Sequence, residues 1–257
     1  MEIANKGGLT PNHGKKLVVD LEEGRFARYP VKTHVVKSGD SLAELLDTYV
    51  KEHLQEGDQI YMSEKMVAIS QGRAIPIDEI KPSKLALFLL KFVYKSPHGV
   101  GLGSPYTMEL AIRDVGAPLI LLGAFCAALT KPFGIRGVFY RVVGNRARTI
   151  DGPADYVIPP YNKYAKMSPL KPMKVCKELA AHIGHDVCII DANDLGLELL
   201  GNSNKKGIKK DFVRRLFKDN PLDQSIQQTP IAIVRRVADD FVEPEFEEVA
   251  EKEQTNE

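Results

Sequence analysis

Two aspartates that follow a short apolar run are the first candidates for metal chemistry. The run at residues 187–190 has the pattern of a buried strand, Asp191 ends it, and Asp194 lies shortly after it. α/β proteins bind ligands in the crevice beyond the C-terminal ends of their strands, and two carboxylates there can hold a hard cation that bridges to phosphate oxygens. Aspartate is also a common turn residue, so an ordinary turn is the alternative.

Two lysines are candidates for binding the phosphate groups, because a lysine presents a compact positive charge to phosphate oxygens. One is Lys32; the other, Lys65, follows Glu64 in the middle of an apolar, alternating run that ends at Gly72. Charges placed in such a run cost free energy unless something binds them, and a polyanion with its metal would do so. The alternative is a lysine on an outward, solvated face of a strand.

Two loops add further candidates. Residues 98–105 are rich in glycine and run into a predicted helix, so their backbone N–H groups could face an anion. They lack the Gly-Lys-Ser/Thr ending of a phosphate-binding loop, which favours a flexible lid or a plain connector. Asp151 lies in a Gly-Pro loop just after a basic stretch that ends at Arg148. An ordinary Asp-Gly turn is the alternative for Asp151.

The elements that would position these residues alternate along the chain. Strands are predicted at residues 33–36, 59–69, 138–143, 187–191 and 231–237, from alternating or short β-rich runs. Helices are predicted at residues 41–53, 84–94, 105–115, 173–183 and 208–218, with Ser41, Ser83 and Ser104 as N-caps. The mixture predicts an α+β, or mixed α/β, fold.

Composition sets the outer limits. The chain has 257 residues with 44% apolar residues, enough for a packed core, and its net charge of +1 gives no reason to expect nucleic-acid or membrane attraction. Three cysteines without CxxC spacing predict a reducing cytoplasm, with neither a disulfide nor a zinc site. The uncharged run at residues 117–130 is too short to span a membrane, and we expect it to be a buried core helix.

Three segments are expected. Residues 1–27 are polar and glycine-rich and predict a loosely ordered leader. Residues 28–237 form the folded body, with a division into two subdomains near residues 135–150 as one arrangement. Residues 238–257 carry many acidic residues and predict a disordered tail.

Several segments of the chain resemble the γ-glutamyl ligases of the deazaflavin coenzyme F-420. They begin with Pro30-Val-Lys-Thr33 and continue through the run from Asp58 to Arg73. The resemblance resumes at residues 149–151 and 187–191, and it ends at residues 229–235. It implies a ligase-like fold in which a mixed sheet is flanked by helices, and it implies a homodimer with sites at or near the subunit interface.

The same resemblance implies an activity and a set of roles. A nucleoside triphosphate, GTP in the family, would phosphorylate a small carboxylic acid, and an amino acid would displace the phosphate. Asp151 and Asp191 would hold Mg²⁺ or Mn²⁺, with Asp194 as a helper. Four residues would line the nucleotide: Lys32, Thr33, Glu64 and Lys65. Arg148 would neutralise the acyl phosphate.

The chain also departs from the family pattern. Ile69 replaces a nucleotide-contacting lysine, Gln71 replaces a carboxylate, and Ala154 stands where the family has a nucleotide-contacting asparagine. The apolar and glycine-rich segment at residues 96–133 has no counterpart in the resemblance. An acid–amine ligase is therefore the first hypothesis. A non-catalytic homologue that binds a nucleotide or another anion is the second, and a dimeric interaction protein is the third.

Overall fold

A six-stranded mixed sheet forms the base of the molecule. The computed structural model describes residues 9–93, 101–135, 137–193, 196–223 and 225–244. The sheet order is β1-β2-β8-β3-β6-β7, with all neighbours antiparallel except the parallel pair β3 and β6. The strands are β1 (Val18–Leu21), β2 (Gly24–Val31), β3 (Gln59–Ser63), β6 (Asp186–Asn193), β7 (Gly196–Asn202) and β8 (Ile231–Val237). This confirms the mixed α/β class.

Helices cover both faces of the sheet, so its central strands are apolar on both sides. Ile60 and Met62 point into one core with α1 (Leu42–Tyr49), α2 (Glu64–Ser70) and α8 (Pro172–Ile183). The residue between them, Tyr61, points into the opposite core beneath α9 (Lys210–Leu216). This alternation follows the two-residue period of a strand, which sends successive side chains of β3 to opposite faces of the sheet.

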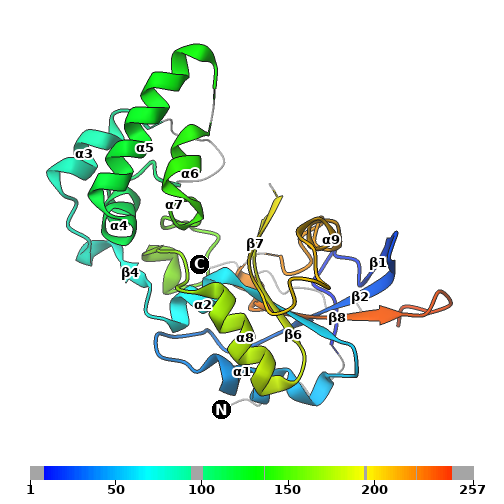
Figure 1. Ribbon diagram of the computed structural model, residues 1–257. Helices are drawn as coiled ribbons and strands as arrows, with labels where there is room; N and C mark the ends of the chain where they lie inside the picture. The colour runs from blue at the N-terminus through cyan, green and yellow to red at the C-terminus, as the bar shows by residue number, and fades with distance from the viewer. Residues whose placement is uncertain (1–8, 94–100, 136, 194–195, 224, 245–257) are drawn as a thin grey trace.

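A second, helical part projects away from the sheet, and we call residues 84–148 the helical lobe (Figure 1). It contains α3 (Lys84–Leu90), α4 (Pro105–Val115), α5 (Ala117–Thr130), α6 (Val138–Val143) and α7 (Asn145–Arg148). Its own core includes Leu110, Ile120 and Val143. A small antiparallel pair lies beside it: β4 (Ala74–Pro76) and β5 (Tyr164–Lys166). Short 3-10 turns occupy Lys51–His53, Ile77–Glu79, Lys131–Phe133, Tyr161–Lys163 and Ser225–Gln227.

The three predicted serine caps and the predicted helix end at Gly184 are confirmed, whereas α1 and α3 end earlier than predicted, at Tyr49 and Leu90. Side chains of Ser41, Ser83 and Ser104 accept backbone N–H bonds at the starts of α1, α3 and α4. Gly184 ends α8 in the left-handed conformation that glycine adopts without strain. Strands β6 and β8 and helices α8 and α9 also lie where they were predicted.

Three predicted strands were wrong in part or in full. The strand predicted at residues 59–69 ends at Ser63, whose hydroxyl accepts the N–H of Lys65 and so begins α2. Residues 138–143 form α6, between two glycines with positive φ. Residues 33–36 are irregular, because β2 extends only to Val31. Short apolar runs satisfy either period, which explains these errors.

The predicted leader was wrong for residues 18–27, which form β1 and the first half of β2 and pair within the main sheet. The start of the predicted tail also contacts the fold. Phe241 packs on the small core of Leu17, Val18 and Ala27, and the N–H of Val18 donates to Glu243 at 3.3 Å. The rest of the predicted tail, residues 245–257, lies outside the described residues.

The prediction of a buried core helix at residues 117–130 was wrong about burial. The helix exists as α5, but only Ile120 and Gly123 are buried in it, while Phe125 is 61% exposed. Among the described residues no single helix is long and apolar enough to cross a membrane. Pro105–Val115 and Ala117–Phe133, bent by 116°, pass that test of length and composition only as a pair.

Candidate functional site

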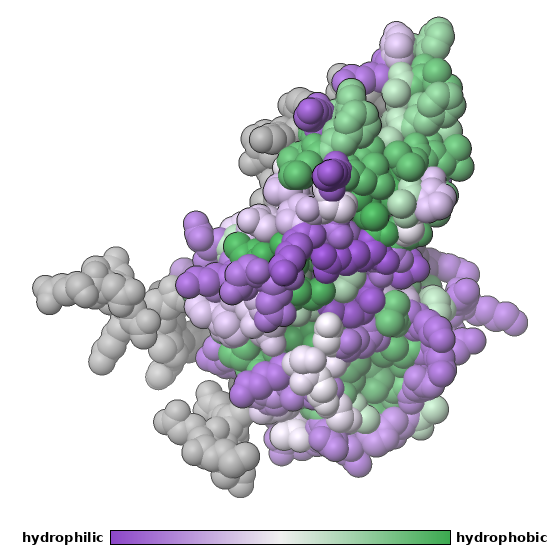
Figure 2. Space-filling model, turned by 90° about the vertical axis from the view of Figure 1, so that its left-hand side faces the viewer, coloured by the Kyte–Doolittle hydropathy of each residue, from purple (hydrophilic) through white to green (hydrophobic). Residues whose placement is uncertain are grey.

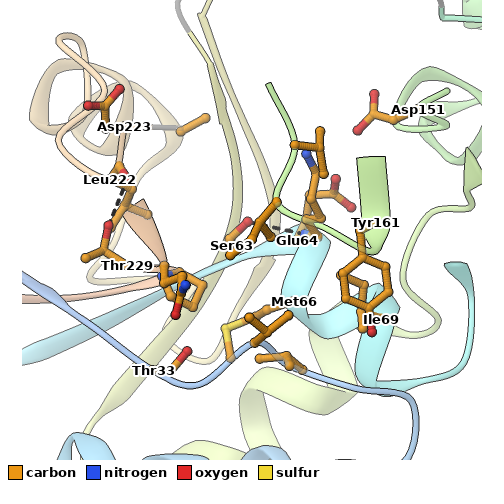
Figure 3. A pocket seen from close by; sticks show the side chains of 18 of the residues that line it. Thr33, Ser63, Glu64, Met66, Ile69, Asp151, Tyr161, Leu222, Asp223 and Thr229 are labelled. Atoms are coloured by element: carbon orange, nitrogen blue, oxygen red, sulfur yellow. Dashed lines mark hydrogen bonds between the residues drawn. The ribbon is translucent and has the colours of Figure 1, made fainter. Parts of the chain in front are cut away.

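A pocket lies where the parallel strands β3 and β6 end, in the position that α/β proteins use for ligands. Ser63 and Ile190 are register partners at this edge, so Glu64 and Asp191, the next residues, both reach the pocket. Side chains from the loop after β2 and from the loop that carries Thr229 complete its wall (Figure 3). The pocket has a volume of about 210 Å³.

A buried ion pair lies at the inner end of the pocket. Glu64, the first residue of α2, is 2% exposed, and its carboxylate accepts a hydrogen bond from Lys166 on β5. The Lys166 ammonium also donates to the carbonyl of Thr149 at 3.0 Å and lies 3.4 Å from a carboxylate oxygen of Asp151. Backbone hydrogen bonds in both directions between Asp151 and Lys166 hold these two residues side by side.

Burial and crowding of carboxylates shift the acidities in this site. Burial, together with the nearby Asp191 and Asp151, raises the pKa of Glu64 to about 7, although Lys166 opposes that rise. Burial disfavours the Lys166 ammonium, but Glu64 and Asp151 outweigh it and raise the pKa of Lys166. Burial and Asp151 also raise the pKa of Asp191. The site therefore carries more negative charge than its lysine neutralises, a condition that favours an added cation.

One oxygen of Glu64 points to the same need. Its Oε2 is buried without a hydrogen-bond partner among the described residues. Such an atom is costly unless a ligand or ion satisfies it. Asp151 and Asp191 line the same pocket, and carboxylate oxygens are the ligands that Mg²⁺ and Mn²⁺ prefer.

The described part of the chain has no group of three or more His, Cys, Asp or Glu side chains arranged to bind a metal ion. Mg²⁺ is commonly held by one or two carboxylates, with water and substrate phosphates as its other ligands.

The structure brings together five of the residues that the sequence analysis proposed. Thr33, Glu64, Lys65, Asp151 and Asp191 all line the pocket. Within it, the charge of Lys65 acts on Asp191, as expected for a cation beside the strand-end carboxylate.

Two other proposed residues do not line the described pocket. Lys32 is exposed on the chain that leaves β2, with its neighbour Thr33 turned inward. Arg148 lies on α7, where its guanidinium pairs with Glu198 at 3.5 Å and stands over the ring of Tyr140. Asp194 lies outside the described residues.

The departures from the ligase pattern have clear places in the structure. Ile69 lines the pocket, so an apolar side chain stands where the resemblance places a lysine. Gln71 is bonded to the backbone of Leu170 in both directions, donating to its carbonyl at 3.1 Å and accepting from its N–H at 2.6 Å. Gln71 therefore holds a loop together and is not among the residues that line the pocket.

Gly72-Arg73 also has a structural role. Gly72 has a left-handed φ of +69° that suits glycine. Arg73 forms an ion pair with Asp114 of α4, which is 2% exposed as a side chain, and Arg146 contacts the same carboxylate at 2.6 Å. This pairing ties the helical lobe to the end of α2.

Sequence reasoning missed several residues of the site, including His34, Tyr161 and Asp223. Lys166 is the most consequential of them. It lies in a short segment without periodicity, Tyr164–Lys166, and its partner Glu64 is 102 residues away in the chain. The local sequence offers no signal for that pairing.

Comparison with known proteins matches part of the chain to a family model. Residues 30–135 match the family model described as F420-0:Gamma-glutamyl ligase, and no curated protein matches the chain. The matched range contains Thr33, Glu64 and Lys65. It also includes all of residues 96–133, so the expectation that this segment has no counterpart in the family was wrong. It does not reach Asp151, Lys166 or Asp191. Over residues 30–135 the chain thus carries a domain of the F420-0:gamma-glutamyl ligase family.

Proposed function

We propose that the chain is a nucleotide- and divalent-metal-dependent ligase that joins a small carboxylic acid to an amine, such as an amino acid, through an acyl phosphate. The family match supports amide-bond ligation in general. The observation that carries the specific proposal is the buried, unpartnered oxygen of Glu64, which shares one pocket with Asp151, Asp191 and Lys65.

The reaction has two steps. In the first, an oxygen of the substrate carboxylate attacks the γ-phosphorus of the triphosphate, and a nucleoside diphosphate leaves. In the second, the amine nitrogen attacks the acyl carbon, inorganic phosphate leaves, and the amine gives up a proton. In both steps negative charge builds up on the oxygens of a departing phosphate group, so fixed positive groups nearby accelerate the reaction.

The residues of the pocket divide these tasks. One or two of the pocket carboxylates, Asp151 and Asp191, would hold the divalent cation together with phosphate oxygens, with the unpartnered oxygen of Glu64 in the same pocket. The bound cation would neutralise and orient the phosphates. Lys65 supplies a second positive charge near Asp191, and Thr33 contributes to the wall opposite. Lys166 keeps the carboxylates from repelling one another before the ligands arrive, because its ammonium lies against both Glu64 and Asp151.

Thermal unfolding with and without ligands tests this proposal. A ligand that binds only the native state raises its stability by mass action. We expect GTP with Mn²⁺ to raise the melting temperature more than either alone, and phosphate release to require an acid and an amine in addition. No stabilisation by any nucleoside triphosphate with metal would contradict the proposal.

A nucleotide- or anion-binding protein without catalysis is the second candidate. The observation that favours it is the apolar Ile69 in the pocket wall, where the resemblance places a lysine. Metal-dependent nucleotide binding without phosphate release, across a panel of acids and amines, would identify this second function.

The homodimer and the cytoplasmic location remain predictions. Sedimentation equilibrium of the purified full chain would measure its subunit number directly. A monomer at every concentration would remove the dimeric interaction protein as a third candidate. Fractionation of cells that express the chain would test the location.

A further inference from the structure

The helical lobe presents an unusually apolar surface to solvent. In α5, Leu121, Phe125 and Leu129 are 43%, 61% and 55% exposed, and they recur every fourth residue, so they share one side of the helix. The surface continues past the helix end to Phe133, which is 80% exposed. Figure 2 shows hydrophobic residues gathered over the projecting lobe, in contrast to the polar base.

This helix differs from an ordinary surface helix. Surface helices bury an apolar stripe and turn a charged face to water. α5 has no charged residue among its 14 residues, and the only residues buried in it are Ile120 and Gly123. The close contact of Gly123 with Phe139 and Val143 of α6 accounts for its inner side. The outer side of α5 is therefore suited to contact with another apolar surface.

The length of α5 argues against a membrane span. Fourteen residues extend ~21 Å at ~1.5 Å per residue, less than the ~30 Å of a bilayer's hydrocarbon core. Its bent neighbour α4 cannot extend it across a bilayer without breaking the lobe. In α4, Met108, Leu110 and Ala111 are buried in the lobe core, and Asp114 is held by Arg73 and Arg146. A helix too short to span a bilayer can still bury an exposed apolar side at the boundary between headgroups and acyl chains of one leaflet.

Charge selects among partners for this surface. The whole chain has a net charge of +1, but residues 84–148 contain nine lysines and arginines against two acidic residues. Both acidic residues already have partners within the fold, Glu109 with Arg113 and Asp114 with two arginines. Lys131, at the end of α5, and Arg141 of α6 are exposed. A second copy of this lobe would place like charges together, whereas an anionic surface would be attracted.

We propose that the helical lobe docks on the surface of a bilayer that contains anionic lipids. Leu121, Phe125, Leu129 and Phe133 enter the boundary between headgroups and acyl chains, and Lys131 and Arg141 contact lipid phosphates. The inference rests on the lobe alone and does not depend on the proposed function. It replaces the expectation of no membrane partner, which rested on net charge and overlooked the uneven distribution of charge along the chain.

Vesicle flotation of the full chain tests the proposal. The probes are vesicles of phosphatidylcholine alone and vesicles of phosphatidylcholine with phosphatidylserine. We expect the chain to float with the mixed vesicles at low salt, and to bind them about tenfold more weakly at high salt or on neutral vesicles. Absence of binding to the mixed vesicles would overturn the proposal.

Two pairs of variants separate the contributions of apolar and charged residues. Phe125→Ser with Leu129→Ser should abolish flotation, while the control Ile226→Ser, at a position 59% exposed elsewhere in the chain, should not. Lys131→Glu with Arg141→Glu should weaken binding about tenfold or more, and the exposed control Lys205→Glu with Lys206→Glu should have little effect. Thermal unfolding of each variant checks that it folds.

The competing occupant, a second copy of the chain, has its own readout. Light scattering would show a dimer that Phe125→Ser with Leu129→Ser dissociates, without flotation of the wild type. That result would overturn membrane docking and assign the surface to self-association. Binding that is equal on neutral and anionic vesicles would overturn the role of charge.

Discussion

Lys166 on β5 and Glu64 on α2 form an ion pair whose side chains are only 5% and 3% exposed. The pair connects β5, the strand beside the helical lobe, to the start of α2, which directly follows β3 of the main sheet. The two residues are 102 positions apart in the sequence. Buried ion pairs contribute little net stability, because desolvation offsets their attraction, but breaking one is costly. This pair lies against the pocket, where Oε2 of Glu64 has no hydrogen-bond partner among the described residues.

The first prediction concerns the removal of Lys166. Lys166→Met leaves the Glu64 carboxylate buried without its cation, so we expect about 3–5 kcal/mol of lost stability. The double variant Glu64→Gln with Lys166→Met removes both charges and should recover much of that loss. Urea unfolding of wild type, both single variants and the double variant gives the coupling energy. Additive effects of the two substitutions would show that the pair does not interact.

The second prediction concerns pH. The pKa of Glu64 is about 7 in the folded chain against an ordinary 4.5, so the folded state holds this proton more tightly than the unfolded state. A raised acid pKa adds stability at low pH, and that stability is lost as pH rises through about 7. Gln cannot ionise, so the variant Glu64→Gln lacks this loss. Its unfolding free energy relative to that of the wild type should therefore rise by up to roughly 3 kcal/mol as the pH increases from 5 to 8.

Urea unfolding at several pH values, in buffer with a metal chelator, measures this difference. Asp155→Asn, in an exposed loop near the pocket, serves as the control and should follow the wild-type curve. A pH-independent difference between wild type and Glu64→Gln would mean that Glu64 has an ordinary pKa.

The features of the fold and the site that the sequence could predict are those set by neighbouring residues in the chain. Asp191 was predicted at the end of a strand because apolar residues precede it directly, although β6 continues two residues further, to Asn193. Serine caps identified three helix starts. Glu64 was placed in the site but within a strand, because the apolar run after Ser63 fits both periods. The helix begins at Glu64 because the hydroxyl of Ser63 caps it. That serine was visible in the sequence, but the alternating apolar pattern favoured a strand there.

The remaining features depend on distant contacts. The partner of Glu64 is set by where β5 lies beside β4, and no local pattern near Lys166 encodes that position. The exposure of α5 could not be read from its apolar composition, because a buried core helix has the same composition. Arg148 was placed in the site by the resemblance, but it is the last residue of α7, and its guanidinium pairs with Glu198.

The third prediction concerns metal binding. Asp191→Asn removes a charge from the pocket and keeps its shape, so Mn²⁺-dependent GTP affinity should fall about tenfold or more while the chain stays folded. Isothermal calorimetry with and without Mn²⁺ measures the change, and Asp155→Asn is the matched control outside the pocket. Equal Mn²⁺-dependent affinity in wild type and Asp191→Asn would remove Asp191 from the metal site.

The fourth prediction concerns the end of the described chain. From composition, removal of residues 240–257 should change little, but Phe241 packs on Leu17 and Val18, and Arg25 donates to its carbonyl at 3.3 Å. We therefore expect this truncation, and also Phe241→Ala, to cost about 2 kcal/mol. Removal of residues 245–257 alone should leave the unfolding free energy nearly unchanged. Denaturant unfolding of the three variants decides between a docked and an undocked Phe241.

The fifth prediction concerns the substrate. A phosphate-bearing precursor and a triphosphate together require several cations, but Ile69 lines the pocket where the resemblance has a lysine, and Gln71 is engaged with Leu170. We expect purine triphosphate binding with metal, and little transfer of glutamate to the coenzyme F-420 precursor. Ile69→Lys should tighten triphosphate binding about fivefold by adding a charge, whereas the volume control Ile69→Met should not.

Mass spectrometry of a reaction with precursor, glutamate, GTP and Mn²⁺ measures the first half of this prediction, and calorimetry measures the second. Efficient formation of the glutamylated coenzyme by wild type would show that a lysine at position 69 is dispensable and that the pocket accepts the precursor as it stands. If Ile69→Lys alone forms the product, the apolar residue in the pocket wall is what sets this chain's substrate apart from the precursor. Unchanged triphosphate affinity in that variant would place the phosphates away from Ile69, nearer Lys65 and the carboxylates at the ends of β3 and β6.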